Sequence, residues 1–331
     1  MLNKKKRQFF SIRGCSDFLL NNSGSSVISA RTMDYDIKIN AEVVVIPREK
    51  QFISSLSPDD HYMKWISKYG FVGTNVLHSL ELTDGLNEKG LSVSTLWLDE
   101  STYPKTFNLP KEKAITIVDL PSLILGCFAN VEEVINGLKD IVVLGKAGIE
   151  APETILPIHL AIHDCNKKSI VIEFVNGRIQ IYENAVSVLT NSPPYPEQIK
   201  NLKKFQNINS LNEKNITIPG DMSSTSRFAL IYLLNHFVQK SNNDRQAIMN
   251  ALHILNRVTM INEELPGAST QYQIIRDHIN LIYYVTANDN MNLRALDMKK
   301  LNFSSKNKIM CFPIANDSWY ISANDELKPF K

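Results

Sequence analysis

Short apolar or alternating runs of residues recur along the chain. They occupy residues 26–30, 42–46, 91–98, 158–162, 170–174, 179–182, 281–286 and 309–312. Runs of roughly four to eight such residues, bounded by turn signals, predict β-strands. Turn-forming residues separate several of them: Asn87-Glu88-Lys89-Gly90, Asn166-Lys167-Lys168 and Asn176-Gly177. The pair Asn176-Gly177, between residues 170–175 and 178–183, predicts a β-hairpin.

Three other segments have helical spacing. Asn130 is placed to cap a helix, with Glu133 three residues on. The apolar faces are formed by Val131, Val134, Ile135 and Leu138, by Leu230, Leu233, Leu234, Phe237 and Val238, and by Ile248, Leu252 and Leu255. Because strands dominate both ends of the chain and helices lie between them, we expect an α+β fold with helices packed on mainly antiparallel sheet. No repeat or linker divides the chain, which predicts one domain.

The composition of the chain argues against several classes of function. The 331 residues are 44% hydrophobic and 21% charged, as in globular proteins, and the net charge is only +2 with both signs interspersed. Nucleic-acid binding is therefore not expected, and the basic run 4–7 is interpreted as a solvated tail. No apolar run is long enough to span a membrane, and residues 9–12 are too short for the core of a signal peptide. As written the chain is expected in the cytoplasm, or in the periplasm if its start is truncated.

Four cysteines in so long a chain do not form a disulfide framework. Cys127, Cys165 and Cys311 lie in apolar or strand-like surroundings and are expected in the core. Cys15 differs, because Arg31 and Asp34 follow it at the distance of a hairpin. The alternative is a packing cysteine beside a surface ion pair.

If cleavage made Cys15 the first residue, its α-amine, with a pKa of about 7.7–8.0, could act as the base for its own thiol. A guanidinium such as that of Arg31 would favour the thiolate, and a carboxylate such as that of Asp34 could orient the amine. Positions 31 and 34 of an extended strand point to opposite faces. The sequence therefore predicts either a turn between them or one side chain that reaches around the strand.

Two later segments carry further candidates. Asn191, before Ser192-Pro193-Pro194, is interpreted as a fixed amide able to donate into an oxyanion hole; the alternative is a turn asparagine. Arg227 lies in the first turn of a helix that Ser223 or Ser224 caps, where the helix dipole disfavours a cation. Its position suggests an anionic partner, and the alternative is an arginine facing solvent.

Metal and phosphate chemistry find little support. His159 and His163 are four residues apart in a predicted strand, where roughly 13 Å separates them and they cannot share one ion. The other histidines show no ligand spacing, and the chain has no phosphate-binding glycine loop.

These residues form a recognisable set. The set is Cys15, Arg31-Thr32-Met33-Asp34, Asp84-Gly85-Leu86-Asn87-Glu88-Lys89-Gly90-Leu91, Thr190-Asn191-Ser192-Pro193, Ser226-Arg227-Phe228 and Asn288-Asp289-Asn290-Met291-Asn292. In order and spacing it resembles the choloylglycine hydrolase (conjugated bile acid hydrolase) and penicillin V acylase family. The resemblance implies an N-terminal-nucleophile fold, a four-layer αββα sandwich of two mainly antiparallel sheets.

The resemblance also implies roles. Cys15 would be the nucleophile, its freed α-amine the base, Arg31 and Asp34 its charge partners, Asn191 an oxyanion donor and Arg227 an organiser near the thiol. The implied reaction is hydrolysis of a linear C–N amide through a thioester, without metal or cofactor. A homo-oligomer, dimer or tetramer, stays open.

Two features depart from the family pattern. Trp97 stands where family enzymes usually carry Asn or Tyr; its main-chain N–H could still serve the oxyanion, while the indole would favour flat or aliphatic acyl groups. Trp97 and the short stretch before Arg227 resemble the Gram-negative branch, which includes penicillin V acylases and acyl-homoserine-lactone acylases. Residues 1–14 would also have to be removed as a leader, leaving one domain over 15–331. Gly14, without a side chain, would leave its carbonyl open to the thiol.

The predicted substrate is a small N-acyl amide, penicillin V-like or an N-acyl homoserine lactone. Three alternatives stay open. They are a conjugated bile salt hydrolase, an unprocessed non-catalytic relative that binds an acyl ligand, and an enzyme that transfers the acyl group to an amine instead of water.

Overall fold

A computed structural model describes residues 14–57, 59–76, 78–105, 109–148, 154–203, 205, 218–261 and 268–319. All structural statements below concern this part of the chain. The basic run 4–7 and residues 1–13 of the expected leader lie outside the described residues.

The first large sheet has six strands in the order β14-β1-β2-β15-β16-β17, and each neighbouring pair is antiparallel. Its strands are β1 (Ser16–Leu19), β2 (Ile28–Tyr35), β14 (Val188–Leu189), β15 (Ser269–Asp277), β16 (Ile282–Ala287) and β17 (Asn290–Asp297). The short strand β1 begins one residue after Cys15, so the main chain of Cys15 leaves the sheet between β14 and β2. This places the candidate nucleophile at one end of the sheet.

The second large sheet has eight strands in the order β13-β12-β11-β8-β7-β6-β3-β18, again antiparallel throughout. Its strands are β3 (Glu42–Ile46), β6 (Phe71–Asn75), β7 (Leu82–Asn87), β8 (Ser92–Trp97), β11 (Ile158–His163), β12 (Ser169–Val175), β13 (Arg178–Glu183) and β18 (Met310–Pro313). Two small sheets pair β4 (Gln51–Ser57) with β5 (Asp60–Ile66), and β9 (Ala114–Thr116) with β10 (Val142–Leu144).

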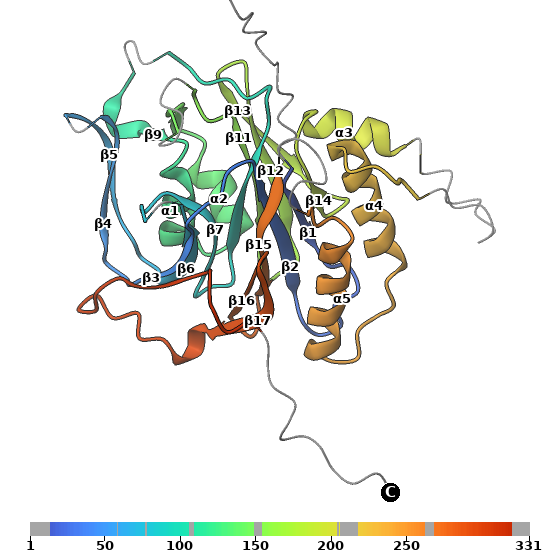
Figure 1. Cartoon of the computed structure of the whole chain (residues 1–331). Coiled ribbons are helices and arrows are strands. Elements are labelled where there is room, and N and C mark those ends of the chain that lie inside the picture. Colours follow the sequence, from blue (N-terminus) through green and yellow to red (C-terminus); the bar gives the residue numbers. More distant parts are fainter. Residues whose placement is uncertain are drawn as a thin grey trace, which may run out of the picture.

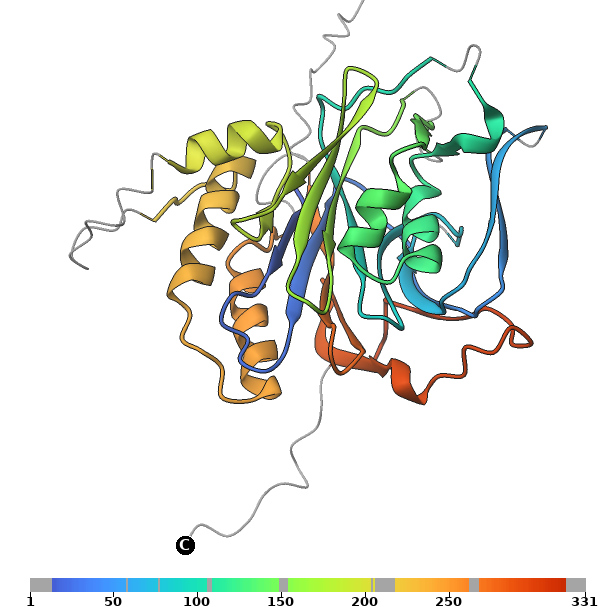
Figure 2. The ribbon, with the colours of Figure 1, turned by 180° about the vertical axis from the view of Figure 1, so that it is seen from behind.

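Helices cover the outer face of each large sheet. The helices are α1 (Leu120–Cys127), α2 (Val131–Gly137), α3 (Tyr195–Leu202), α4 (Ser224–Phe237) and α5 (Asp244–Asn256), with 3₁₀ turns at Lys111–Lys113 and Met298–Lys300. Helices α1 and α2 pack on the eight-stranded sheet, and α4 and α5 pack on the six-stranded sheet (Figure 1). The view from behind shows the same sequence of layers, helix, sheet, sheet, helix (Figure 2). The expected four-layer αββα sandwich is therefore confirmed.

The turn and the helix caps that the sequence predicted are present in the structure. Asn176 and Gly177 both adopt positive φ, 54° and 69°, between β12 and β13, as a tight hairpin turn requires. Asn130 caps α2 by accepting from the Glu133 N–H at 2.9 Å, and Ser223 caps α4. The strand predicted at 26–30 is observed as β2, Ile28–Tyr35, which continues past the apolar run because Arg31 and Asp34 are themselves buried within it.

The expectation for the three other cysteines was wrong. Cys311 is exposed on β18, at the edge of the eight-stranded sheet, where its Sγ lies 3.6 Å from Glu42 Oε1. Cys127 and Cys165 are only half-buried. Apolar sequence neighbours did not reveal that β18 is an edge strand, because strand order is set by the tertiary fold.

No helix in the described part of the chain is both long and apolar enough to cross a membrane. Within these same residues, no group of three or more His, Cys, Asp or Glu side chains is placed to hold a metal ion.

Candidate active site

Cys15 lies where the two sheets meet, at the start of β1. The pairing of β1 with β2 sets Asp17 opposite Arg31, so the hairpin spacing seen in the sequence is a real antiparallel pair. The Cys15 side chain is 4% exposed, and its Sγ lies 3.8 Å from the Asp34 carbonyl oxygen and 3.9 Å from Met33 Sδ. The thiol is thus held in place but still borders a cleft.

That cleft is mostly apolar. Its wall is made by Cys15, Met33, Asp34, Tyr35, Ile37, Lys38, Ile39, Val76, Glu81, Thr83, Thr95, Leu96, Trp97, Gly148, Leu156 and Ile158. These residues come from β2, β7, β8, β11 and the loops beside them, so both sheets contribute to the wall. Aliphatic and aromatic walls around a reactive group suit an apolar portion of a small ligand.

Asn191 holds the main chain of Cys15. Its Oδ1 accepts from the Cys15 N–H at 2.6 Å and from Arg227 Nη2 at 3.0 Å, and its Nδ2 donates to the Trp97 carbonyl at 3.0 Å. The orientation of the amide is fixed, since a flipped amide would set its NH₂ against two donors. In this arrangement the side-chain oxygen of Asn191 serves the nitrogen of Cys15.

Arg227 is buried rather than facing solvent. From the first turn of α4, its Nη1 donates to the Cys15 carbonyl at 2.7 Å and to Ser16 Oγ at 2.6 Å. The negative charges that act on it belong to Asp34 and Cys15. Burial lowers the pKa of Arg227, and these two groups oppose that effect, which agrees with the anionic partner expected from its place in the helix.

Gly14 packs directly against this arginine. A Cβ at position 14 would lie 2.4 Å from Met260 Cε and 3.1 Å from Arg227 Nη2. The bond between Gly14 and Cys15 therefore lies in a space that accommodates a bare backbone.

Arg31 and Asp34 occupy opposite faces of a continuous strand, so the turn that the sequence left open does not occur. Arg31 faces the other sheet, where its Nη1 donates to the Thr83 carbonyl at 2.7 Å. Asp34 accepts from Thr270 Oγ1 at 2.7 Å and from Thr32 Oγ1 at 3.1 Å. The two charges flank Cys15 from two sides, because Cys15 lies at the end of the neighbouring strand.

On balance, the surroundings of Cys15 raise the pKa of its thiol and so favour the neutral form. Burial raises the pKa of the Cys15 thiol, while the Arg31 and Arg227 guanidinium groups act to lower it. Burial also raises the pKa of Asp34 to about 6, against the opposing effects of Arg227 and of its hydrogen bonds with Thr270 and Thr32. The positive charges around the thiol thus offset part of the cost of forming a thiolate in a buried place.

Trp97 ends β8 at the wall of the cleft. Its carbonyl oxygen accepts a hydrogen bond from Asn191 Nδ2, and its indole Nε1 donates a hydrogen bond to Asp99 Oδ1 at 2.6 Å. The residue therefore links the cleft wall to the group that holds Cys15.

The two histidines of β11 are structural neighbours of the site and do not form a metal pair. His159 Nε2 contacts the Thr190 carbonyl at 2.8 Å, next to Asn191, and His163 Nε2 contacts Asp17 Oδ1 at 2.6 Å. Both are fully buried, and each has its own partners.

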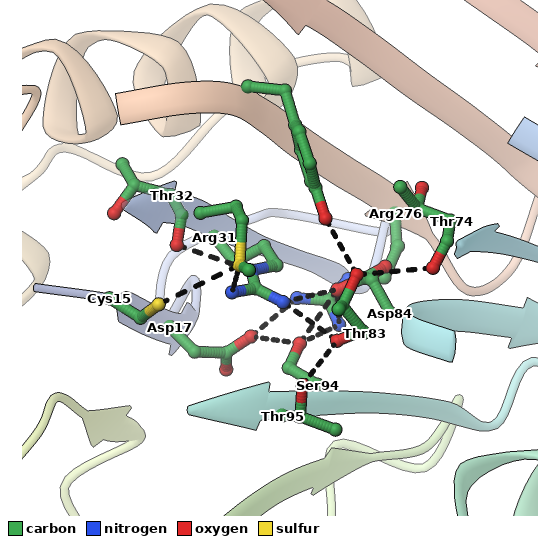
Figure 3. Close-up of polar contacts among 12 residues, drawn as sticks. Cys15, Asp17, Arg31, Thr32, Thr74, Thr83, Asp84, Ser94, Thr95 and Arg276 are labelled. Carbon is green, nitrogen blue, oxygen red and sulfur yellow. Dashed lines mark hydrogen bonds and ion pairs between the residues drawn. The ribbon is translucent and has the colours of Figure 1, made fainter. Parts of the chain in front are cut away.

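Sequence reasoning missed the polar groups behind the thiol. Figure 3 shows Asp17, Asp84, Ser94 and Arg276 joined between the sheets, beside Arg31. The available signal was a charge beside apolar residues of a strand: Asp17 precedes Phe18-Leu19, and Arg276 follows Ile274-Ile275, and both charges are fully buried. Buried charges of this kind require partners.

The comparisons with known proteins agree with this geometry. Residues 15–311 match the family model for linear amide C–N hydrolases, choloylglycine hydrolase family. A penicillin V acylase from Pectobacterium atrosepticum is 27% identical over 302 residues, covering 84% of this chain and 79% of that protein. A bile salt hydrolase/transferase from Clostridium perfringens is 26% identical over 318 residues, covering 87% and 93%.

Solved structures give the same result. The penicillin V acylase from Agrobacterium tumefaciens superposes with a TM-score of 0.80 at 25% identity, covering 96% of this chain and 98% of that one. A variant of the conjugated bile acid hydrolase from Clostridium perfringens superposes with a TM-score of 0.79 at 25% identity, covering 94% and 100%. The near-equal similarities do not separate the acylases from the bile salt hydrolases, so the Gram-negative branch stays a prediction.

The match over nearly the whole chain, together with the sandwich and its N-terminal-nucleophile arrangement, places this protein among the linear amide C–N hydrolases of the choloylglycine hydrolase family.

Proposed function

We propose that this enzyme hydrolyses the amide bond of a small N-acyl substrate through a thioester on Cys15, after residues 1–14 have been removed. The observation that carries the proposal is the position of Cys15. Its thiol borders an apolar cleft, while Asn191 and Arg227 hold its main-chain nitrogen and carbonyl. A nucleophile fixed at both ends beside an acyl-sized cleft is preorganised for attack on a bound carbonyl.

Removal of the leader would convert the main-chain nitrogen of Cys15 from an amide into a basic amine. In the intact chain the Cys15 nitrogen is an amide and has no basicity, whereas the freed α-amine titrates at about 7.7–8.0. We propose that the Cys15 thiol attacks the Gly14 carbonyl carbon, and that the Gly14–Cys15 C–N bond breaks as the nitrogen gains the thiol proton. Water then hydrolyses the resulting thioester, which releases the leader as a carboxylic acid and restores the thiol. The bare backbone at Gly14 supports this step, because a side chain there would contact Met260 and Arg227.

In the proposed reaction the α-amine takes the thiol proton, and the thiolate attacks the substrate carbonyl carbon. The amine then returns the proton to the leaving nitrogen as the C–N bond breaks, which leaves a thioester. Water, deprotonated by the same amine, attacks the thioester and releases a carboxylic acid. This is general acid–base and nucleophilic catalysis by a single residue.

The neighbouring residues have proposed roles in this sequence. Arg31 and Arg227 stabilise the thiolate, and Asn191 Oδ1 orients the amine. The second N–H of Asn191 Nδ2, beyond the one given to Trp97, is available to the oxyanion. Asp34 balances the charge of Arg227.

The apolar cleft wall, with Trp97 in it, favours a flat or aliphatic acyl group. We therefore propose a penicillin V-like phenoxyacetyl amide or an N-acyl homoserine lactone as the substrate class. A conjugated bile salt is the second candidate, because a bile salt hydrolase/transferase is nearly as similar to this chain as the penicillin V acylase.

The test is a panel of penicillin V, a glycine-conjugated bile acid and long-chain acyl homoserine lactones, assayed with wild type, Cys15→Ala and Cys127→Ala. We expect turnover of an apolar acyl amide by wild type and by Cys127→Ala, which changes a half-buried cysteine far from the cleft, and no turnover by Cys15→Ala. Undiminished activity in Cys15→Ala would refute the proposal. The intact mass of the wild type reports on removal of the leader, and fully active protein that retains residues 1–14 would contradict the processing step.

A further inference from the structure

A buried ionic cluster lies between the two sheets, behind Cys15 and Arg31. We call it the intersheet cluster and define it as Asp17, Asp84, Ser94, His163 and Arg276. Its members come from both sheets, β1 and β15 of the first and β7, β8 and β11 of the second. Every member is fully buried. The mechanism proposed above makes no use of this cluster.

Arg276 is the centre of the cluster. Its Nη2 lies 2.6 Å from Asp17 Oδ2, and its Nη1 lies 3.2 Å from Asp84 Oδ2. Ser94 Oγ contacts both carboxylates, at 2.7 and 2.8 Å, and accepts from Arg276 Nη1 at 2.7 Å. A single guanidinium thus bridges two carboxylates.

Both of these carboxylates are also neighbours of Arg31. Asp17 is the direct cross-strand partner of Arg31 on β1 and β2, so the two side chains project from the same face. Asp84 Oδ2 lies 3.9 Å from Arg31 Nη1. Asp84 is closer to Arg276 than to Arg31, as Figure 3 shows. Asp17 contacts Arg276 through Oδ2 and His163 through Oδ1.

The hydrogen bonds of Arg31 end on uncharged acceptors. They are the Thr83 carbonyl at 2.7 Å, the Thr32 carbonyl at 3.2 Å and Met33 Sδ at 3.1 Å. Met33 Sδ in turn lies 3.9 Å from the Cys15 thiol. Because these acceptors carry no net charge, they do not neutralise the guanidinium. The positive charge of Arg31 therefore still acts on its other neighbours, Cys15 among them.

We propose that Arg276 is a positioning residue for the reaction: by holding Asp17 and Asp84, it keeps these carboxylates from neutralising Arg31, whose charge then stabilises the Cys15 thiolate. The inference rests on the proposed role of Cys15 as the nucleophile. Arg276 itself contacts neither Cys15 nor the wall of the cleft. Its effect on the thiol passes through Arg31.

The charges around each group support this division. The Arg31 charge is second only to burial among the influences on the pKa of Cys15, and it acts to lower it. The charged and titratable groups that face Cys15 are Arg31, Asp34, Arg227 and Tyr272. Those that face Arg31 are Cys15, Asp17, Asp34, Asp84 and Tyr272. Those that face Arg276 are Asp17, Asp84, His278 and Tyr283, while His163 contacts the other oxygen of Asp17. Asp17 and Asp84 thus face both arginines, and the distances assign them to Arg276.

The test measures how the alkylation rate of Cys15 by iodoacetamide depends on pH. Mass spectrometry of the peptide that contains Cys15 makes the reading independent of the other cysteines and of any substrate. In Arg276→Met we expect the midpoint of the profile to rise by about one pH unit or more, because Asp84 then pairs with Arg31. Turnover at pH 7 should fall about tenfold, in proportion to the thiolate fraction.

Three further variants separate charge from structure. In Arg276→Met/Asp84→Asn the carboxylate that Arg31 would capture is absent, so the midpoint should return toward the wild-type value. Arg276→Lys keeps the cation and should restore most of the effect. Val134→Ala makes a cavity in α2, on the far side of the eight-stranded sheet, and should lower stability without moving the midpoint.

If Arg276→Met does not fold, because Asp17 is left buried without a counter-charge, the pair variant Arg276→Met/Asp17→Asn removes both charges together and should give the same upward shift. An unchanged midpoint in a folded Arg276→Met or in the pair variant overturns the proposal. So does a midpoint in Arg276→Met/Asp84→Asn that is as high as in Arg276→Met. Failure of the proposed function is read separately, from the turnover of Cys15→Ala and from the intact mass of the wild type.

Discussion

Asn191 Oδ1 lies 2.6 Å from the main-chain nitrogen of Cys15, although 176 positions separate the two residues in the chain. The contact is made possible by β14, which pairs with β1 and ends two residues before Asn191. The same oxygen also accepts from Arg227. One amide therefore connects the segment at Cys15, the first turn of α4 and, through its nitrogen, the end of β8 at Trp97.

Replacing this amide should impair the chemistry more than the fold. We expect Asn191→Ala to lower kcat by roughly 10²-fold, the usual loss when one preorganised polar group at a reacting centre is removed. Steady-state kinetics measure the effect. Asn235→Ala is the matched control, because Asn235 is also buried and bonds main-chain groups, those of Leu19 and Asn21, away from the thiol. Equal losses of kcat in the two variants would contradict a specific role for Asn191.

A side chain at position 14 should slow removal of the leader, because the space around Gly14 is filled by Met260 and Arg227. A valine at position 14 would press on Met260 and Arg227, so Gly14→Val should move the scissile carbonyl and slow cleavage by about tenfold or more. The measurement is the fraction of chain that retains residues 1–14, followed by intact mass over time. Gly220→Val serves as the control, since a Cβ there has no atom within 4 Å among the described residues. Cleavage of Gly14→Val at the wild-type rate would show that the packing does not matter.

Asp34 should reduce stability at neutral pH. Burial raises its pKa to about 6 in the folded protein, above its ordinary value of 3.8, so the folded state binds the proton more tightly than the unfolded state does. Stability is then lost as pH rises from about 4 to above 6. A difference of about two pH units, at about 1.4 kcal/mol each, makes Asp34→Asn up to about 3 kcal/mol more stable than wild type at pH 7.

Urea unfolding at pH 4 and pH 7 checks this sign. The advantage of Asp34→Asn should be present at pH 7 and should largely vanish at pH 4, where the wild-type carboxyl is already protonated. Activity should fall in the same variant, because the charge that faces Arg227 is lost. A stability difference between the two proteins that does not shrink from pH 7 to pH 4 would contradict the raised pKa of Asp34.

Trp97 should determine the acyl preference. Trp97→Ala removes the indole from the cleft wall, so kcat/KM for a phenoxyacetyl amide should fall by about tenfold, in line with the loss of one aromatic contact. Kinetics across the amide panel measure it, with Trp319→Ala, an exposed tryptophan, as the control. A uniform decrease for all acyl groups would argue against a role in selecting the acyl group.

The sequence determined the parts that depend on few residues close together. It predicted the tight turn at Asn176-Gly177, the cap at Asn130 and a cap at Ser223 or Ser224, of which the structure shows Ser223, because local backbone geometry and side-chain hydrogen bonds decide these features. The ordered set of motifs from Cys15 onward also led to the family and hence to the layered sandwich, both of which the comparisons confirm.

How those residues face one another depends on the packing of the two sheets. Arg31 and Asp34 flank Cys15 from opposite faces of an unbroken strand, and the exposure of Cys311 follows from its place on an edge strand. The intersheet cluster could not be read from the chain, because Asp17, Asp84 and Arg276 are brought together by the packing of two sheets. The alternation of residues along a strand predicts which face of the sheet a side chain lies on. The residue that it contacts depends on the order of the strands and on which face of the other sheet packs against it.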